Sequence, residues 1–328
     1  MIIAKTPFRM SFAGGGSDLA SFYREHGGGA VVSTSIDKYV YVTVNKSFDE
    51  KIRLKYSQVE EVKRPFQLEH KRAGEILNML KIEKGIEISS LADIPSRGTG
   101  LGSSSSFTVA LLHALHTYKE QYASPEKLAQ EASKIEIDLL GEPIGKQDQY
   151  AAAYGGLNII KFNPDDSVCV DPIICKKKTI TTLEDDLIMF YTGITRSASK
   201  ILEEQKNNLD NKSKKIEIMK RMVLLANELK QELKKNNTKA FGEILHENWL
   251  LKKEMAAGIS SSKIDYWYNK AIKAGALGGK LLGAGGGGFL LFFAPKEKHN
   301  SIKRALCDLR PVDFSFDYQG SKIIFIHD

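Results

Sequence analysis

The chain has 328 residues, of which 42% are hydrophobic and 27% are charged, with 27 Gly and 9 Pro. This composition excludes disordered and collagen-like proteins, and a length about twice the roughly 150 residues of one domain predicts two packed domains or one large one. No apolar run approaches the roughly 18 residues of a membrane-spanning helix, and the N-terminus does not resemble a cleavable leader. We therefore expect a cytoplasmic protein without a membrane partner.

The net charge is +7, from 47 Lys and Arg against 40 Asp and Glu. Such an excess suits nucleic acid, an anionic membrane surface or small phosphorylated substrates. Much of it lies between residues 206 and 235, where Lys is mixed with Glu as on a solvated helix surface. The densest run, residues 176–178, has three lysines, which are too few for a nucleic-acid patch. We therefore expect small-molecule partners and no nucleic acid, and the oligomeric state is left open.

The first part of the chain alternates predicted strands and helices. Residues 39–44 are β-branched and aromatic and predict a strand, with 51–56 as an antiparallel neighbour. Residues 69–81 carry apolar side chains at three- and four-residue spacing, which predicts an amphipathic helix. The next segments predict, in order, a strand (85–91), a glycine and serine loop (95–106) and a strongly apolar helix (107–118).

Ser124 followed by Pro125 predicts the start of a helix that runs to about residue 140, because serine caps free amides and proline fits the first helical position. Residues 155–170 are strand-like, and 176–184 have the polarity of a surface connection. We therefore place the domain boundary there, with domains 1–180 and 181–328, both α+β. The second domain is expected to contain a strand (187–191), two or three helices (197–258), a helix (264–274), a strand (289–293), a helix (300–309) and a closing strand (322–326).

Three glycine clusters lie far apart in the chain, at residues 14–16, 98–102 and 283–288. Their joint explanation is a backbone that approaches a bulky anion from several sides. The central cluster runs directly into the apolar helix near Phe107, so its amides and the positive end of the helix dipole would face one point. This arrangement predicts a phosphate-binding loop whose serine hydroxyls can also face a metal. A serine-rich helix cap with a flexible loop is the structural alternative.

Two common nucleotide-binding motifs do not fit. The pattern Gly-x-x-x-x-Gly-Lys-Ser/Thr of P-loop proteins occurs nowhere in the chain. Gly283, Gly285 and Gly288 match Gly-x-Gly-x-x-Gly, but a predicted helix precedes them and a predicted strand follows, the reverse of a dinucleotide-binding fold. A nicotinamide enzyme is therefore disfavoured.

Together the three glycine segments resemble the galactokinase, homoserine kinase, mevalonate kinase and phosphomevalonate kinase superfamily, the GHMP kinases. The matching stretches are Thr6-Pro-Phe-Arg9 with Gly14 to Asp18, Pro95 with Gly100-Leu-Gly-Ser-Ser104, and Leu282-Gly-Ala-Gly-Gly-Gly-Gly288. They occur in the family's order and span almost the whole chain. The resemblance implies an α+β fold with an N-terminal domain similar to domain 2 of ribosomal protein S5, a ferredoxin-like C-terminal domain, and ATP and substrate between them.

Moving the γ-phosphoryl group of ATP to a hydroxyl requires positioning, charge neutralisation and a group that orients or deprotonates the nucleophile. By resemblance, Asp148 is the candidate base or orienting carboxylate, and Arg9 lies beside the transferred phosphoryl group. The family pattern also implies Glu136 and Ser103 as Mg²⁺ ligands. The implied ATP-binding residues are Gly98, Gly100, Leu101, Gly102, Ser103, Ser104 and Ser105, and the implied substrate-binding residues are Gly15, Gly16, Ser17, Asp18, Gly193, Arg196, Gly285 and Gly286.

The first glycine cluster differs from that of galactokinases, where a Glu-His pair stands in place of Gly15 and Gly16. Loss of an acid and a ring opens space and removes negative charge, so the sugar is expected to be larger at that end or to carry a phosphate. The form Ala13-Gly-Gly-Gly-Ser-Asp18 resembles that of heptose 7-phosphate kinases, as do the surroundings of Asp37 and the stretch 191–196. The resemblance implies phosphorylation of the anomeric hydroxyl of D-glycero-D-manno-heptose 7-phosphate to the 1,7-bisphosphate, for nucleotide-activated heptose synthesis.

Other functions remain open at this point. A fucokinase or another kinase acting at C1 of a sugar shares the same motifs. A nucleic-acid-binding protein suits the basic charge, although the chain has no basic strip with interleaved aromatic residues. A catalytically inactive family member is a third alternative, against which the presence of Ser103, Glu136 and Asp148 argues.

Overall fold

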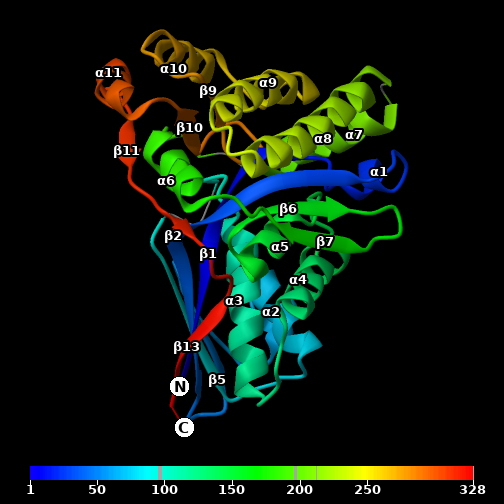
Figure 1. The fold of residues 1–328 in the computed structure, drawn as a ribbon. Coiled ribbons are helices and arrows are strands. Elements are labelled where there is room, and N and C mark those ends of the chain that lie inside the picture. Colours follow the sequence, from blue (N-terminus) through cyan, green and yellow to red (C-terminus); the bar gives the residue numbers. More distant parts are fainter. Residues whose placement is uncertain (95–97, 196–197, 212, 328) are drawn as a thin grey trace.

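The computed structural model describes residues 1–94, 98–195, 198–211 and 213–327, and it has two lobes. Figure 1 shows a tapered lobe that holds both termini and a helix-rich lobe at its wide end. The first lobe consists of β1 (Ile2–Ala13), α1 (Ala20–Tyr23), β2 (Gly29–Lys46), β3 (Ile52–Lys55), β4 (Val59–Val62), η1 (Pro65–Gln67), α2 (Lys71–Met79), β5 (Ile86–Ala92), α3 (Ser103–Tyr118), α4 (Pro125–Ser133), the π-helical η2 (Lys134–Leu139), α5 (Gln147–Tyr154), β6 (Leu157–Phe162) and β7 (Val168–Pro172).

The second lobe follows in sequence and is α+β as well. Its elements are α6 (Lys177–Asp186), β8 (Leu187–Tyr191), α7 (Ala198–Asn211), α8 (Ser213–Lys234), α9 (Lys239–Met255), α10 (Ser262–Lys273), β9 (Gly278–Leu281), β10 (Phe289–Phe293), η3 (Lys296–Lys298), α11 (His299–Ala305) and β11 (Arg310–Val312). The chain ends with β12 (Phe316–Asp317) and β13 (Lys322–Ile326). The predicted two-domain α+β fold is confirmed.

Strand β2 organises the sheet of the first lobe. Its 18 residues pair with β1 along one side, and on the other side with β6 near its start and β5 near its end. The strand is rich in Val, and its inward side chains such as Val32, Val42 and Val44 are fully buried. Helix α3 packs on β1 and β2, and nearly every residue from Val109 to Leu115 is buried, as expected of a helix that is apolar on all sides.

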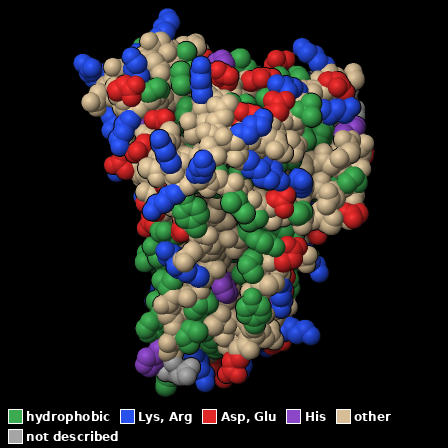
Figure 2. Space-filling view, viewed as in Figure 1, with side chains coloured by type: hydrophobic (Ala, Val, Ile, Leu, Met, Phe, Trp, Pro, Cys, Tyr) green, Lys and Arg blue, Asp and Glu red, His purple; other side chains and the backbone are tan. Residues whose placement is uncertain are grey.

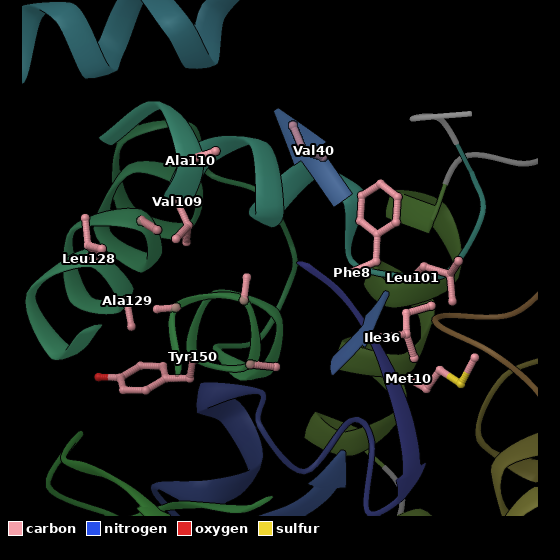
Figure 3. Packing of buried hydrophobic residues seen from close by; sticks show 14 of the residues in the cluster. Phe8, Met10, Ile36, Val40, Leu101, Val109, Ala110, Leu128, Ala129 and Tyr150 are labelled. Carbon is pink, nitrogen blue, oxygen red and sulfur yellow. The ribbon is translucent and has the colours of Figure 1, made fainter. Parts of the chain in front are cut away.

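The central glycine loop is anchored in this core by Leu101, whose side chain is fully buried. Figure 3 shows Leu101 near Phe8, Met10 and Ile36, at the junction of the loop with the sheet. The backbone amide of Arg9 donates to the Leu101 carbonyl at 3.0 Å. The loop and the end of β1 are therefore held side by side, which positions the residues of the site.

The second lobe has its own sheet, ordered β11-β8-β10-β9. Strand β10 lies between β8 and β9, and its five consecutive apolar residues are all buried. Helices α9 and α10 pack against β9, and α8 packs against both α9 and the N-terminal strands β1 and β2. Helix α8 therefore contributes to the contact between the two lobes.

Several local predictions are confirmed. The helix expected at 69–81 is α2, and the strand expected at 289–293 is β10. Ser124 caps α4 by accepting a hydrogen bond from the Lys127 amide at 3.2 Å. The helix that begins there continues as η2, a π-helical stretch that carries the chain to Leu139.

Other predictions are wrong at places where contacts with distant segments of the chain determine the local structure or the strand partner. Strand β3, expected beside the strand at 39–44, pairs in parallel with β5 and antiparallel with β4 instead. The expected surface connection at 176–184 is mostly helix α6, which spans the predicted domain boundary. The closing strand β13, expected within the second domain, pairs with β1, and β12 pairs with β2. This return gives the β1 edge a hydrogen-bonding partner, so the end of the chain belongs to the first sheet.

Many of the charged side chains on the surface form ion pairs with side chains of opposite charge. On the face in Figure 2, Lys and Arg side chains are interspersed with Asp and Glu, most densely over the upper lobe. On α8, Arg221 bonds both Glu228 and Glu247, and Lys230 bonds Asp171 at 2.9 Å. Within the described ranges, the chain forms no helix of the length and apolarity needed to cross a membrane.

Candidate active site

A cavity of about 610 Å³ lies where the two lobes meet. In the first lobe its lining comes from the end of β1 with the first glycine cluster, the central glycine loop with the start of α3, and the segment that leads into α5. In the second lobe it comes from helices α7 and α9, strand β9 and the third glycine cluster. All three glycine clusters therefore contribute to one cavity, as the sequence predicts. Among the residues that line the cavity are Arg9, Gly15, Gly16, Asp18, Gly98, Gly100, Gly102, Ser103, Ser104, Ser105, Glu142, Asp148, Asn248, Lys252 and Lys280.

The central loop ends directly at the cavity with the first turn of α3. The residue before the helix is Gly102, with φ at 74°, and no side chain in the described structure caps the helix. The first amides of an α-helix have no acceptor within the helix, and the helix dipole makes this end positive. Ser103, Ser104 and Ser105 line the cavity here. The alternative of a serine-capped helix start is therefore wrong, and the geometry suits an anion.

Some of these glycines are required because the second and third glycine clusters lie in direct contact. A Cβ at Gly100 would lie 2.2 Å from the Leu282 carbonyl oxygen, and one at Gly283 would lie 2.4 Å from the Gly100 Cα. Likewise, a Cβ at Gly288 would lie 2.3 Å from the Thr99 carbonyl oxygen. The second and third clusters thus pack backbone against backbone. Their glycines allow this close approach in addition to forming the cavity wall.

Arg9 and Asp148 form the central ion pair of the cavity. Arg9 donates from Nε and Nη2 to the two carboxylate oxygens of Asp148, both at 2.8 Å, and from Nη1 to the Gly100 carbonyl at 2.7 Å. The Arg9 side chain is only 4% exposed, whereas that of Asp148 is 25% exposed. Asp148 occupies the first turn of α5, where the helix dipole favours a negative charge. This two-point contact fixes the orientation of both groups toward the cavity.

Asp18 is a buried carboxylate on the neighbouring wall. It accepts hydrogen bonds from the Gly16 amide at 2.9 Å, the Gln147 amide at 3.2 Å and the Gln147 side chain at 3.0 Å. Burial and then the charge of Asp148 raise the pKa of Asp18 above its ordinary value. A Cβ at Gly145 would lie 2.0 Å from an Asp18 oxygen, so this turn requires glycine. Two carboxylates from different motifs therefore meet beside Arg9.

Glu136 lies behind the cavity wall. Its carboxylate is fully buried and accepts from Ser105 Oγ at 2.7 Å, Thr108 Oγ1 at 2.6 Å and Gln149 Nε2 at 2.5 Å. Arg72 adds an ion pair at 3.1 Å. Glu136 is not among the lining residues, whereas Ser105 is. Glu136 therefore does not face the cavity itself but is hydrogen-bonded to Ser105, which does. The π-helical turn η2 carries Glu136, in keeping with the frequent use of such turns at functional sites.

Several predicted site residues lie elsewhere or have other contacts. Ser17 uses its hydroxyl for backbone groups of Gly14 and Ala30 and is fully buried. Leu101 is in the hydrophobic core. Gly285 packs on Ile259, and the Gly286 amide donates to the Ile259 carbonyl, so neither faces the cavity. Gly193 is exposed outside the lining, and Arg196 lies outside the described residues.

Sequence reasoning missed three polar residues that the second lobe adds to the cavity: Asn248 and Lys252 from α9, and Lys280 from β9. Lys280 Nζ donates to the Ser11 carbonyl at 2.7 Å. Burial, with the nearby charges of Lys252 and Arg9, holds the pKa of Lys280 well below its usual range. Burial lowers the pKa of Lys252 to about 8, and Asp18 opposes this shift. Asn248 and Lys252 are four residues apart and therefore share a helix face, but nothing in the sequence marks that face as part of a site.

Comparison with known proteins agrees with this arrangement. Residues 62–156 match the GHMP kinases N terminal domain, and residues 229–311 match the GHMP kinases C terminal domain. The D-glycero-alpha-D-manno-heptose 7-phosphate kinase of Campylobacter jejuni is 31% identical over 98% of both chains. The galactokinase of Pyrococcus furiosus is 27% identical over 93% of this chain and 92% of that one.

Among solved structures, a D-glycero-D-manno-heptose 1-phosphate kinase from Bacteroides thetaiotaomicron superposes with a TM-score of 0.81, 26% identity and complete coverage of both chains. The likeness thus extends over both lobes. With the family domains matched in both lobes and a kinase relative spanning nearly the whole length, this chain belongs to the GHMP kinases and is a phosphotransferase that acts on an alcohol group of a sugar.

Proposed function

We propose that this enzyme transfers the γ-phosphoryl group of ATP to the C1 hydroxyl of D-glycero-D-manno-heptose 7-phosphate and yields the 1,7-bisphosphate. The observation that carries the proposal is the Arg9–Asp148 pair, which lies between the open start of α3 and the wall formed by Gly15, Gly16 and Asp18. The similarity to a heptose 7-phosphate kinase supports the choice of sugar. We place the reaction in the cytoplasm, where it would supply nucleotide-activated heptose synthesis.

The cavity offers a place for each part of the reaction. We assign the phosphates of ATP to the glycine loop, where the amides of the first turn of α3 offer donors. The acceptor hydroxyl would lie against Asp148, which orients it and takes up its proton as the oxygen attacks the γ-phosphorus. The bond between the γ-phosphorus and the bridging oxygen of ATP breaks, and ADP leaves. Arg9 is bonded to Asp148 and to the loop carbonyl of Gly100, so it can stabilise the negative charge on the transferred group. Asp18 would bind further hydroxyls of the sugar.

The oxygen donors at the start of α3 suit Mg²⁺, which prefers carboxylate, hydroxyl, phosphate and water ligands. Among the described residues no group of three or more His, Cys, Asp or Glu forms a metal site. A cation bound mainly by ATP phosphates needs few protein ligands, so the donor set fits. We propose Ser103 and Glu136 as the residues that hold it, with Glu136 acting through its bond to Ser105 Oγ. When bound, Mg²⁺ would neutralise phosphate charge.

A panel assay tests the proposed reaction. ADP release is measured with heptose 7-phosphate, heptose 1-phosphate, unphosphorylated heptose, L-fucose and D-galactose as acceptors. Phosphorus NMR of each product then identifies the hydroxyl and anomer that were modified. We expect turnover with heptose 7-phosphate and a new signal at C1. Preferred turnover of fucose or galactose would replace the assignment with another C1 sugar kinase, and turnover of the 1-phosphate would reverse the position of transfer.

A further inference from the structure

The space above Gly15 and Gly16 is filled by the second lobe. A Cβ at Gly16 would lie 2.1 Å from Gln205 Nε2 and 3.2 Å from Lys252 Nζ. Lys252 Nζ donates to the Gly15 carbonyl at 3.1 Å and to Gln205 Oε1 at 2.8 Å. The two glycines were expected to leave room for a larger or phosphorylated sugar. The structure shows that this room also admits a lysine ammonium group from α9.

Lys252 retains binding capacity toward the cavity. An ammonium group has three donors, and within the described chain Lys252 uses two of them. Its side chain is 7% exposed, and it is one of the residues that line the cavity. Gln205 is completely buried and supports the ammonium group from behind. A buried cation held at one position by two acceptors loses little conformational freedom when an anion arrives.

Asn248 lies one helical turn before Lys252 and presents a second donor. Its Oδ1 accepts from the Gly14 amide at 3.1 Å, whereas its buried Nδ2 has no hydrogen-bond partner in the part of the chain that is described. Asn248 is completely buried and lines the cavity. A buried unpaired amide donor is unfavourable, and a ligand oxygen would relieve this cost.

We propose that Lys252 and Asn248 form the binding site for an anionic group of the acceptor, namely the phosphate that the sugar already carries. This inference rests on the proposed sugar phosphate kinase function and assigns the phosphate to α9. Both residues offer N–H donors, as a phosphate requires. Three basic side chains, Lys252, Lys280 and Arg9, line this part of the cavity together with the carboxylates of Asp18 and Asp148. Arg9 is already paired with Asp148, whereas no ion pair joins Lys252 to a carboxylate among the described residues, so an anionic group of the ligand supplies its counter-charge.

The site lies on the acceptor side of Asp18. Lys252 Nζ donates to the Gly15 carbonyl at 3.1 Å, and the amide of the next residue, Gly16, donates to Asp18 Oδ1 at 2.9 Å, so Lys252 and Asp18 contact the same short loop. The start of α3, to which we assign ATP, belongs to a different wall. Lys252 is therefore expected to affect binding of the sugar phosphate without affecting binding of the nucleotide.

Calorimetric titration tests the proposal with two ligands, heptose 7-phosphate and unphosphorylated heptose. The ratio of their dissociation constants measures what the phosphate contributes in each protein. We expect wild type to favour the phosphorylated sugar by about ten- to a hundredfold, the usual effect of hydrogen bonds to a charged group. In Lys252→Met this ratio should fall to within about threefold of unity, because methionine fills the space without the charge. The neighbouring Lys253→Met, which removes a partly exposed partner of Asp265, serves as the matched control.

Asn248→Asp provides a second test if Lys252→Met folds poorly. Aspartate keeps the acceptor for the Gly14 amide but replaces the free donor with a negative charge, so the phosphorylated sugar should bind at least about tenfold more weakly. Affinity for a non-hydrolysable ATP analogue should not change in either variant. A phosphate preference that survives in both variants, or a loss confined to the ATP analogue, would overturn the inference.

The two proposals fail in different ways. If wild type does not bind heptose 7-phosphate, the proposed substrate is wrong, and the same ratio is then measured with the sugar phosphate that the panel assay identifies. Equal ratios in wild type and Lys252→Met for that ligand would overturn the role of Lys252 alone. If wild type accepts only unphosphorylated sugars, both proposals are overturned.

Discussion

Replacing Asp148 by asparagine should impair this enzyme in two measurable ways. Both carboxylate oxygens accept from Arg9 at 2.8 Å, so the amide nitrogen of the introduced side chain would face an Arg9 N–H, donor against donor. One charge-assisted bond is then lost, and Arg9, 4% exposed, loses its counter-ion. Breaking a fully buried pair costs about 3–5 kcal/mol, and because Asp148 itself is 25% exposed we expect about 2–3 kcal/mol.

The catalytic effect should be larger than the effect on stability. Removing a group that orients the acceptor and takes its proton lowers kcat by about 10²–10⁴-fold. ATP affinity should stay near the wild-type value because the nucleotide is assigned to the α3 loop. The assay is ADP release at saturating substrates, combined with urea unfolding and titration of a non-hydrolysable ATP analogue.

Asp185→Asn is the control, since Asp185 forms an exposed ion pair with Lys296 and should cost less than about 1 kcal/mol with normal turnover. Near-wild-type kcat in Asp148→Asn would remove Asp148 from the mechanism. A loss of stability no greater than that of the control would refute the argument that Arg9 depends on this carboxylate.

The other predictions concern the metal, the loop contact and pH. Ser103→Ala should raise the Mg²⁺ concentration needed for half-maximal activity by removing a ligand, and Glu136→Gln should raise it through the altered bond to Ser105. An unchanged metal titration would exclude that residue from the Mg²⁺ site. Gly100→Ala should lower the melting temperature strongly, because the new Cβ would lie 2.2 Å from a carbonyl oxygen and φ is +77°. Gly141→Ala, with φ at +66° and open space around it, should cost only about 1 kcal/mol. Equal losses of stability would contradict the close contact at Gly100. Wild-type affinity for the sugar phosphate should fall above pH 8 as Lys252 deprotonates, and Lys252→Met should lack this decline in pH-dependent titrations. The free energy of unfolding should change with pH in the opposite direction. Lys252 binds its proton more tightly in the unfolded chain than in the folded protein, so it makes the stability of wild type rise between about pH 8 and 10.5 relative to Lys252→Met. Urea unfolding at several pH values measures this difference.

The basic net charge is largely a property of the surface. Lys214, Lys220, Arg221 and Lys230 of α8 are paired with glutamates or an aspartate, as expected of a solvated helix. The basic side chains that bear on the proposed chemistry are few and buried: Arg9, Lys252 and Lys280. Their burial, and their convergence on one cavity, distinguish them from the rest.

The amino-acid sequence was sufficient to predict the elements with strong local signals. The apolar spacing of α2, the Ser124 cap of α4 and the apolar run of β10 depend on neighbours a few residues away. The order of the glycine motifs was also sufficient to indicate the family, and with it Arg9, Asp18 and Asp148, which the structure brings to one cavity. Each of these features is encoded within a short stretch of chain.

Contacts between distant segments were decided only by the tertiary structure. Nothing local distinguishes Lys252 from its neighbour Lys253, yet one is buried beside Gly15 and the other pairs with Asp265. The packing of Gly100 on the third glycine cluster and the return of β13 to β1 likewise join residues far apart in sequence. Burial of a charge depends on which elements cover it, and that depends on how the two lobes pack. The motifs were therefore sufficient to predict a kinase, whereas only the fold brings together Lys252 and Asn248, to which we assign the phosphate of the substrate.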